Sequence, residues 1–148
     1  MTRVMASGVF DILHTGHVHY LSEAKKLGDE LVVVVATDST VRRNKHEPIT
    51  PELMRLELVQ SLKPVDYAVL GREGDMYSVV MEIRPDIIAL GYDQTFDELT
   101  LERELGKRGA KVKVVRLGHY VDDLNGTRKI IKRIIEWHTA TSCPEAKK

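Results

Sequence analysis

The chain has 148 residues, of which 43% are hydrophobic and 30% are charged, which is typical of one soluble globular domain with a substantial core. Its 22 basic and 22 acidic residues give a formal net charge of zero, so no global charge draws it to nucleic acid or to a membrane surface. The longest apolar runs, such as residues 31–36, are far shorter than the ~20 residues of a membrane span, and no export signal is visible. The single cysteine, Cys143, excludes an internal disulfide framework, and together these features predict a cytoplasmic protein.

Segments typical of strands and helices alternate along the chain. Helix boundaries are indicated by Gly28 and Gly109 as C-terminal caps, by Thr50 as an N-cap and by Pro51 as a first helical residue. The predicted elements, in order, are a strand at about 3–7, a helix at 16–27, a strand at 30–37, a short helix beginning near Asp38, a polar loop containing residues 42–46, a helix beginning at Thr50 and ending before Pro64, a strand at 67–70, a helix at 77–83, a strand at 86–90, a helix at 96–108, a strand at 111–117 and a last helix capped by residues 125–127.

This alternation predicts an α/β domain with a parallel sheet. Right-handed crossovers between five strands favour a Rossmann-like, doubly wound sheet in the order 3-2-1-4-5. We expect a single domain over residues 1–138 and a flexible tail over residues 139–148. In such a sheet the ligand crevice lies beyond the carboxyl ends of the strands, beside the first strand. The segments expected there are residues 8–17, 38–50, 91–94 and 118–127.

The segment at residues 8–17, with the sequence GVFDILHTGH, falls at the first turn from strand to helix. The first N–H groups of a helix have no intrahelical partner and carry partial positive charge, so this position favours an anion. His14 and His17 can both face one small volume there and donate hydrogen bonds to phosphate oxygens. Helix capping or partial burial is the structural alternative for each histidine. The chain contains neither a P-loop nor a G-x-G-x-x-G fingerprint, so phosphate would be held without a glycine-rich loop.

Residues 8–17 resemble the G-x-F-D-x-x-H-x-G-H signature of the nucleotidyltransferases of the cytidylyltransferase type, and the similarity covers nearly the whole chain. Residues 27–33 resemble the second strand of that family and its approach. Within the family, residues 63–66 and 85–94 are most similar to the archaeal FAD synthases, which are FMN adenylyltransferases.

The resemblance implies transfer of AMP from ATP to FMN, giving FAD and pyrophosphate, with no nucleophile supplied by the protein. His14 and His17 would stabilise charge on the transferring phosphoryl group, and Lys45 would bring a further cation on a loop that closes over the substrates. Mg²⁺ would bridge phosphate oxygens, with few or no protein ligands. The implied nucleotide-binding residues are Gly8, Val9, Phe10, His14, Thr15, Gly16, His17, Arg55, Gly91, Asp93, Tyr120, Thr127 and Arg128.

Four of these candidates have structural alternatives. Lys45 could be a solvated loop lysine, and Arg55 could form an ion pair on a helix surface instead of contacting phosphate. Asp93 could accept hydrogen bonds from ribose or from the base, or could be an ordinary turn residue. Tyr120 could stack on the base or lie on the surface.

The start of the last helix departs from the family pattern. Asn125 and Gly126 replace isoleucine and serine, and Arg128 replaces a small hydroxyl residue, so Arg128 could serve as a cation for phosphate. Thr127 could contact an anion, act as an N-cap, or do both.

Two other functions remain open at this point: a cytidylyltransferase acting on glycerol 3-phosphate or a similar ester, and a non-catalytic nucleotide- or flavin-binding module. The histidine pair favours an enzyme, because a module that only binds needs no transition-state donors. A homodimer is one candidate assembly, since relatives of this size are commonly dimers and the helix over residues 53–62 has apolar residues for an interface.

Overall fold

The computed structural model describes residues 1–44, 46–74, 76–119, 124 and 126–141. The strands are β1 (Arg3–Gly8), β2 (Glu30–Val35), β3 (Tyr67–Leu70), β4 (Ile87–Leu90) and β5 (Lys113–Arg116). The helices are α1 (Thr15–Lys25), α2 (Asp38–Asn44), α3 (Glu52–Gln60), α4 (Met76–Ile83), α5 (Glu98–Lys107) and α6 (Thr127–Thr141). The five strands form one sheet in the order β3-β2-β1-β4-β5, and every neighbouring pair is parallel. The predicted fold class and strand order are therefore confirmed.

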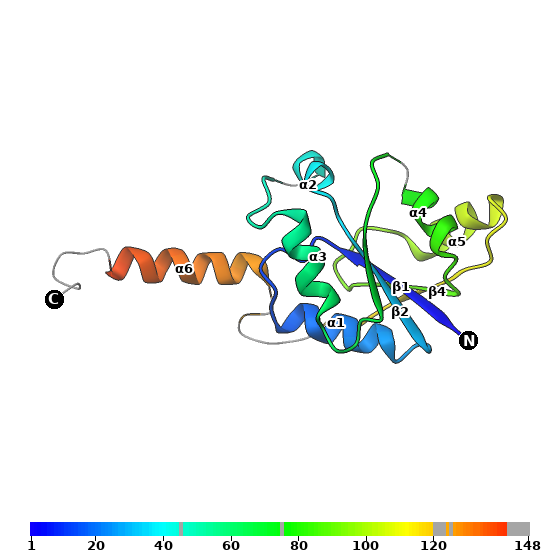
Figure 1. Ribbon diagram of the computed structural model, residues 1–148, viewed down its shortest axis with the longest axis horizontal. Helices are drawn as coiled ribbons and strands as arrows, with labels where there is room; N and C mark the ends of the chain where they lie inside the picture. The colour runs from blue at the N-terminus through cyan, green and yellow to red at the C-terminus, as the bar shows by residue number, and fades with distance from the viewer. Residues whose placement is uncertain (45, 75, 120–123, 125, 142–148) are drawn as a thin grey trace.

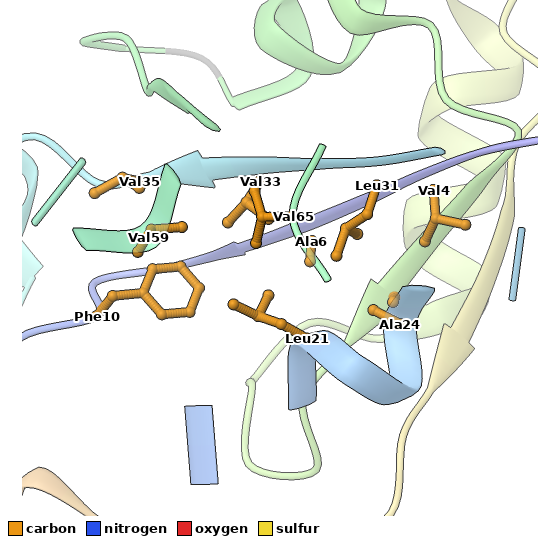
Figure 2. Close-up of a cluster of buried hydrophobic side chains, with 11 residues drawn as sticks. Val4, Ala6, Phe10, Leu21, Ala24, Leu31, Val33, Val35, Val59 and Val65 are labelled. Atoms are coloured by element: carbon orange, nitrogen blue, oxygen red, sulfur yellow. The ribbon is translucent and has the colours of Figure 1, made fainter. Parts of the chain in front are cut away.

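The central strands are buried on both faces, as parallel strands between two helical layers require. Because side chains alternate along a strand, β1 directs Val4 and Ala6 into one hydrophobic cluster and Met5 into the other. The first cluster lies between the sheet and α1 and α3, where Leu21 and Val59 meet the strands (Figures 1 and 2). The second cluster contains buried residues of α4 and α5. This two-sided core holds the carboxyl ends of the strands in one rigid frame.

Two predicted boundaries around α2 and α3 are wrong. Arg42 and Arg43, predicted to lie in a loop, belong to α2, which buries Val41 against the protein body. Thr50 is not the cap of α3, because the helix begins at Glu52 and Pro51 occupies the N-cap position without a side-chain hydrogen bond. The Thr50 hydroxyl instead donates to the carboxylate of Asp11, a residue 39 positions away. The Thr50 hydroxyl therefore bonds to a carboxylate that is distant in sequence, and not to a backbone N–H in the first turn of α3.

The C-terminal elements also differ from the predicted boundaries. Helix α5 begins two residues later than predicted, because the carboxylate of Asp97 accepts a hydrogen bond from the backbone N–H of Thr100 and so caps the helix. Helix α6 continues to Thr141, so residues 139–141 are helical rather than part of a tail. Residues 142–148, which include Cys143, lie outside the described residues. Within the described part of the chain, no helix has the length and apolar character needed to span a membrane.

Two glycines predict opposite effects of the same substitution. A Cβ atom on Gly28 would lie 2.8 Å from both the carbonyl oxygen of Thr2 and Cγ2 of Val4, so Gly28→Ala should destabilise the fold by about 1–3 kcal/mol. A Cβ atom on Gly106, inside α5, would meet nothing within 4 Å, so Gly106→Ala should stabilise the fold by about 0.5–1 kcal/mol. Urea unfolding of the two variants measures both changes, and equal shifts of the same sign would contradict the packing described at Gly28.

Candidate active site

The turn after β1 is tightly folded. Phe10 and Ile12 have positive φ angles of 57° and 54°, a left-handed conformation that is costly for residues with large side chains. The conformation lets the Phe10 side chain fold inward, where it is 3% exposed and packs in the core cluster of Figure 2. A Cβ atom on Gly8 would lie 3.0 Å from the Phe10 ring, so the position requires glycine or a shift of that ring. The buried ring thus pins the backbone of the turn against the end of β1.

His14 and His17 cap α1 by a reciprocal pair of hydrogen bonds. Nδ1 of His14 accepts from the backbone N–H of Gly16 at 3.0 Å, and Nδ1 of His17 accepts from the backbone N–H of His14 at 3.4 Å. The two rings are stacked, with centroids 3.8 Å apart. Burial lowers the pKa of His14 and so favours the neutral imidazole. A neutral ring whose Nδ1 accepts must carry its proton on Nε2, which makes His14 a hydrogen-bond donor through Nε2.

Asp11 connects three segments of the site. Its carboxylate is almost fully buried and accepts hydrogen bonds from the backbone N–H groups of Ile49 and Thr50 and from the Thr50 hydroxyl. Its backbone carbonyl accepts from the hydroxyl of Thr127, at the start of α6. Burial alone would raise the pKa of Asp11, but the Thr50 hydroxyl, the two N–H groups and the charge of Arg55 together hold it below its ordinary value. Asp11 therefore joins three parts of the protein: the first turn, the start of α6, and the segment that precedes α3.

The lowered pKa of Asp11 predicts a pH-dependent stability. The contribution of this carboxylate is complete above its unfolded-state pKa, ordinarily 3.8, and is lost as pH falls through the lower pKa of the folded protein. Asp11→Asn should lower the free energy of unfolding by about 1–3 kcal/mol at pH 7, since an amide cannot satisfy the same three donors. The difference from the unsubstituted protein should shrink as pH falls below 4, measured by urea unfolding at a series of pH values. Glu104→Gln, on the surface of α5, is the control, and an Asp11→Asn difference that does not change with pH would contradict this account.

Arg55 lies inside the protein and not in the pocket. Its side chain has no exposed surface, and its guanidinium donates to the carbonyl oxygens of Thr50, Val9 and Ala36 at 3.0, 2.8 and 2.7 Å. It also forms an ion pair with Asp38 at 2.6 Å. The expected direct contact with phosphate is therefore not available to Arg55 in this structure, and the alternative of an ion pair on the helix surface is also wrong. Arg55 instead lies inside the protein and holds the backbone just beyond the ends of β1 and β2, at Val9 and Ala36.

Arg116 holds the loop after β4. Its guanidinium donates to the carbonyl oxygens of Gly91 at 3.0 Å and Gln94 at 2.8 Å, and it pairs with Glu98 at 2.5 Å. The Gln94 side chain accepts from the N–H of Gly91 at 2.8 Å and donates to the carbonyl of Ser7 at 3.1 Å. The loop is thus tied both to β5 and to the end of β1, which brings residues 91–94 beside the first turn.

These segments enclose a pocket of about 780 Å³ at the carboxyl ends of the strands, within the range of about 300–1,000 Å³ common for small-molecule sites. Ten of the residues predicted to bind nucleotide line it: Gly8, Val9, Phe10, His14, Gly16, His17, Gly91, Asp93, Thr127 and Arg128. Other residues that line it were not predicted individually as site residues: Asp11, His19, Tyr20, Asn44, His46, Tyr92, Gln94, Lys129 and Ile131. Of these, Asp11, Asn44, His46, Tyr92 and Gln94 belong to the segments 8–17, 38–50 and 91–94 that were expected at the crevice. Four distant segments thus converge on one cavity at the predicted position.

The remaining predicted residues have three different outcomes. Thr15 is exposed at the start of α1 and is not among the residues lining the pocket. Lys45 and Tyr120 lie outside the described residues, as does Asn125. Thr127 is the first residue of α6, and its hydroxyl donates to the backbone carbonyl oxygen of Asp11, so the N-cap alternative for its side chain is wrong. Its neighbour Arg128 is exposed and lines the pocket.

The pocket has the chemistry of a phosphate site. It combines the start of a helix, a neutral imidazole donor at His14, a second imidazole at His17 and the cations Arg128 and Lys129. No group of three or more His, Cys, Asp or Glu side chains that could hold a metal ion occurs among the described residues. The carboxylate oxygens of Asp11 are already engaged by protein donors. The side chains that surround the cavity are therefore suited to orienting a polyphosphate and donating hydrogen bonds to it.

A doubly wound sheet with paired imidazoles at its first strand-to-helix turn defines an α/β nucleotidyltransferase. Comparison with known proteins agrees, since the sequence profile described as Cytidylyltransferase-like matches residues 5–144. The chain belongs to the cytidylyltransferase-like family, which confirms the family resemblance seen in residues 8–17.

Individual proteins of this family are similar to the chain over most of its length. A protein of Aciduliprofundum boonei named FAD synthase is 67% identical over 137 residues, which cover 92% of this chain and 92% of that protein. A Thermoplasma volcanium protein with the same name is 58% identical over 136 residues, covering 92% and 96%. A crystal structure described as a lipopolysaccharide core biosynthesis protein from Thermoplasma volcanium superimposes with a TM-score of 0.80 at 61% identity, covering 82% of this chain and 99% of that chain.

Proposed function

We propose that the protein is an FAD synthase that transfers AMP from ATP to FMN and releases pyrophosphate. The observation that carries the proposal is the stacked pair His14 and His17 at the start of α1, facing a cavity lined by cations. High identity to proteins named FAD synthase over nearly the full length of both chains supports this substrate pair over other pairs used by transferases of this fold. Both substrates are small molecules, and the reaction requires no nucleic acid or membrane and fits a cytoplasmic enzyme.

In the proposed reaction, an oxygen of the FMN phosphate attacks the α-phosphorus of ATP in line. The new phosphorus–oxygen bond forms as the bond to the bridging oxygen of the β-phosphate breaks, and pyrophosphate carries away the electron pair. Negative charge grows on the oxygens around the α-phosphorus and on the leaving group. Nε2–H of the neutral His14 and the imidazole of His17 donate to these oxygens, and the helix start contributes its partial positive charge.

We place a divalent cation, Mg²⁺, on the phosphate oxygens of ATP as part of the substrate. Among the described residues no three-ligand cluster suggests a metal site on the protein itself, so the proposal assigns this cation to ATP. Arg128 and Lys129, at the start of α6, lie where they can balance the remaining charge of the triphosphate. The loop at residues 91–94, with Asp93 and Gln94, is placed to contact the ribose or base edge of the nucleotide.

The assignment is tested by incubating the purified protein with FMN, ATP and MgCl₂ and separating the flavins by reversed-phase chromatography. FAD and pyrophosphate should form in equal amounts. Parallel reactions replace ATP with CTP, and FMN with riboflavin or glycerol 3-phosphate. Use of CTP with glycerol 3-phosphate would identify a cytidylyltransferase instead, and binding of FMN or ATP without turnover of any pair would identify a binding module.

Arg128 is expected to contribute mainly to ATP binding. Arg128→Ala should raise the KM for ATP by about tenfold or more, since a charge-assisted hydrogen bond to phosphate is typically worth about 1.5–3 kcal/mol. Lys107→Ala is the control, because Lys107 lies on α5 and pairs with Glu104 of the same helix. An unchanged KM for ATP in Arg128→Ala would remove this residue from the triphosphate site.

A further inference from the structure

The loop that follows β4 is held by Arg116, a residue of β5 that does not line the pocket. A guanidinium has five N–H donors, and each donor of Arg116 has an acceptor. Two of them bond to the carbonyl oxygens of Gly91 and Gln94, at 3.0 and 2.8 Å, and a third bonds to the carbonyl oxygen of Phe96. The other two bond to Oε1 of Glu98, at 2.9 and 2.5 Å. One side chain therefore contacts the loop at its beginning, its middle and its end.

The same loop supplies side chains to the pocket. Asp93 and Gln94 both line the cavity. The Gln94 side chain accepts from the backbone N–H of Gly91 at 2.8 Å and donates to the carbonyl oxygen of Ser7, in β1, at 3.1 Å. The loop is thus tied both to the end of β1 and to Arg116. Asp93 lies in the chain between Gly91 and Gln94, the two residues that take part in both attachments.

This arrangement fixes the main chain of the loop and leaves Asp93 to a ligand. Arg116 bonds to carbonyl oxygens, so it determines the path of the backbone whichever side chains the loop carries. A carboxylate held in this way can accept hydrogen bonds from the hydroxyl groups of a ribose or from the amino group of a base. A loop that is ordered before binding also strengthens affinity, because the apparent affinity falls in proportion to the fraction of molecules in which the loop is competent.

We propose that Arg116 is a positioning residue for the nucleoside part of ATP. It holds the loop at residues 91–96 in the conformation that presents Asp93 to the ribose or the base. The inference rests on the proposed function, since it takes ATP as the nucleotide and this loop as its contact. Arg116 does not touch the substrate, and it takes no part in the transfer of AMP.

The KM for ATP is the quantity that Arg116 should control. Arg116→Ala should raise this KM by about tenfold, which corresponds to a fall of the competent loop population to about one tenth. At saturating ATP, kcat should change by less than about threefold, because bound ATP restores the order of the loop, and the KM for FMN should change as little. A residue that only stabilises the fold would lower the amount of active protein, and therefore the apparent kcat, and would leave the KM for ATP unchanged.

Arg3 provides a matched control at the opposite end of the sheet. Its guanidinium pairs with Glu30 at 2.6 Å and donates to the carbonyl oxygen of Ile83 at 2.7 Å, so it also joins a carboxylate to the main chain. The side chains of Arg3 and Arg116 are 37% and 29% exposed, which makes the two substitutions comparable. Arg3 begins β1 at the end remote from the pocket, so Arg3→Ala should leave the KM for ATP unchanged.

Arg116→Lys keeps the charge but has three N–H donors in place of five. Its KM for ATP should lie between those of the unsubstituted protein and Arg116→Ala. This variant carries the kinetic test if Arg116→Ala does not fold.

Hydrogen exchange followed by mass spectrometry tests the positioning without any reaction. In Arg116→Ala, peptides that cover residues 91–96 should exchange about tenfold faster than in the unsubstituted protein, because the loop opens more often. Addition of ATP with MgCl₂ should restore their protection. In Arg3→Ala, the same peptides should exchange as in the unsubstituted protein.

Three results would overturn the inference while FAD is still formed. An unchanged KM for ATP in Arg116→Ala, or in Arg116→Lys if the alanine variant does not fold, would mean that Arg116 contributes only to stability. Equal increases of the KM for ATP and for FMN would indicate a general disturbance of the pocket. Unchanged exchange at residues 91–96 would mean that the loop keeps its conformation without Arg116. A failure of the unsubstituted protein to form FAD would instead overturn the proposed function, and this inference with it.

Discussion

Replacing His17 by alanine should lower kcat for FAD formation by at least ~10², because a hydrogen-bond donor to the developing charge is lost at the moment of transfer. The KM for FMN should change much less, since that charge is absent in the ground state. Steady-state rates from flavin chromatography, at saturating ATP, separate the two parameters. Near-normal kcat would remove His17 from the catalytic role.

His17→Gln separates donation from capping. A glutamine amide can place an N–H near the position of Nε2, but it does not reproduce the acceptor that Nδ1 offers to the backbone of His14. We therefore expect His17→Gln to retain more activity than His17→Ala while losing similar stability. If the activities of both variants fall in proportion to their stabilities, His17 acts by holding the turn and not by contacting the substrate.

Replacing Arg55 by alanine should have the largest effect on stability. The substitution removes a fully buried guanidinium and leaves the carboxylate of Asp38 and three backbone carbonyl oxygens without their donor. Breaking a buried charge pair in this way costs about 3–5 kcal/mol, a large share of the about 5–15 kcal/mol by which a domain is stable. Urea unfolding should show the midpoint falling accordingly.

Two variants bracket the Arg55 prediction. Arg55→Lys keeps a charge but has a single nitrogen for four acceptors, so its loss of stability should lie between zero and that of alanine. Arg72→Ala removes an ion pair whose side chains are 60% and 54% exposed, and it should cost about 0–1 kcal/mol. Equal losses in Arg55→Ala and Arg72→Ala would contradict the structural role given to the buried guanidinium.

Local patterns predicted the sheet because its central strands β1, β2 and β4 are largely buried and because helices alternate with the strands along the chain. The apolar run of β2 and Gly109, which follows the C-cap of α5 with a φ of 86°, are local signals, and strand order then followed from the handedness of crossovers. The prediction of Gly28 as the cap of α1 is wrong, because the C-cap of that helix is Lys26. The histidine pair was also accessible to sequence reasoning, since its position at the first turn determines both its capping geometry and its access to the pocket.

Sequence reasoning failed where a side chain bonds to a distant segment. Thr50 has the local pattern of a helix cap, but it serves Asp11. Arg55 matched a phosphate-binding position, but three carbonyl oxygens and Asp38 surround it. His46 lines the pocket, as expected for the segment 38–50, but it was predicted only as a loop residue and given no role of its own. Periodicity reports which residues are buried, and it does not report which partners burial brings to them.

The capping bonds of the histidine pair also determine which ions the site can accept. A transition metal binds an imidazole through an unprotonated nitrogen, yet Nδ1 of each ring is already taken by a backbone N–H. Binding zinc or nickel through Nε2 would require moving a proton to Nδ1 and losing a cap of α1. Two neighbouring histidines, which elsewhere form a chelating site, are thus held in a form that favours anions over transition-metal ions.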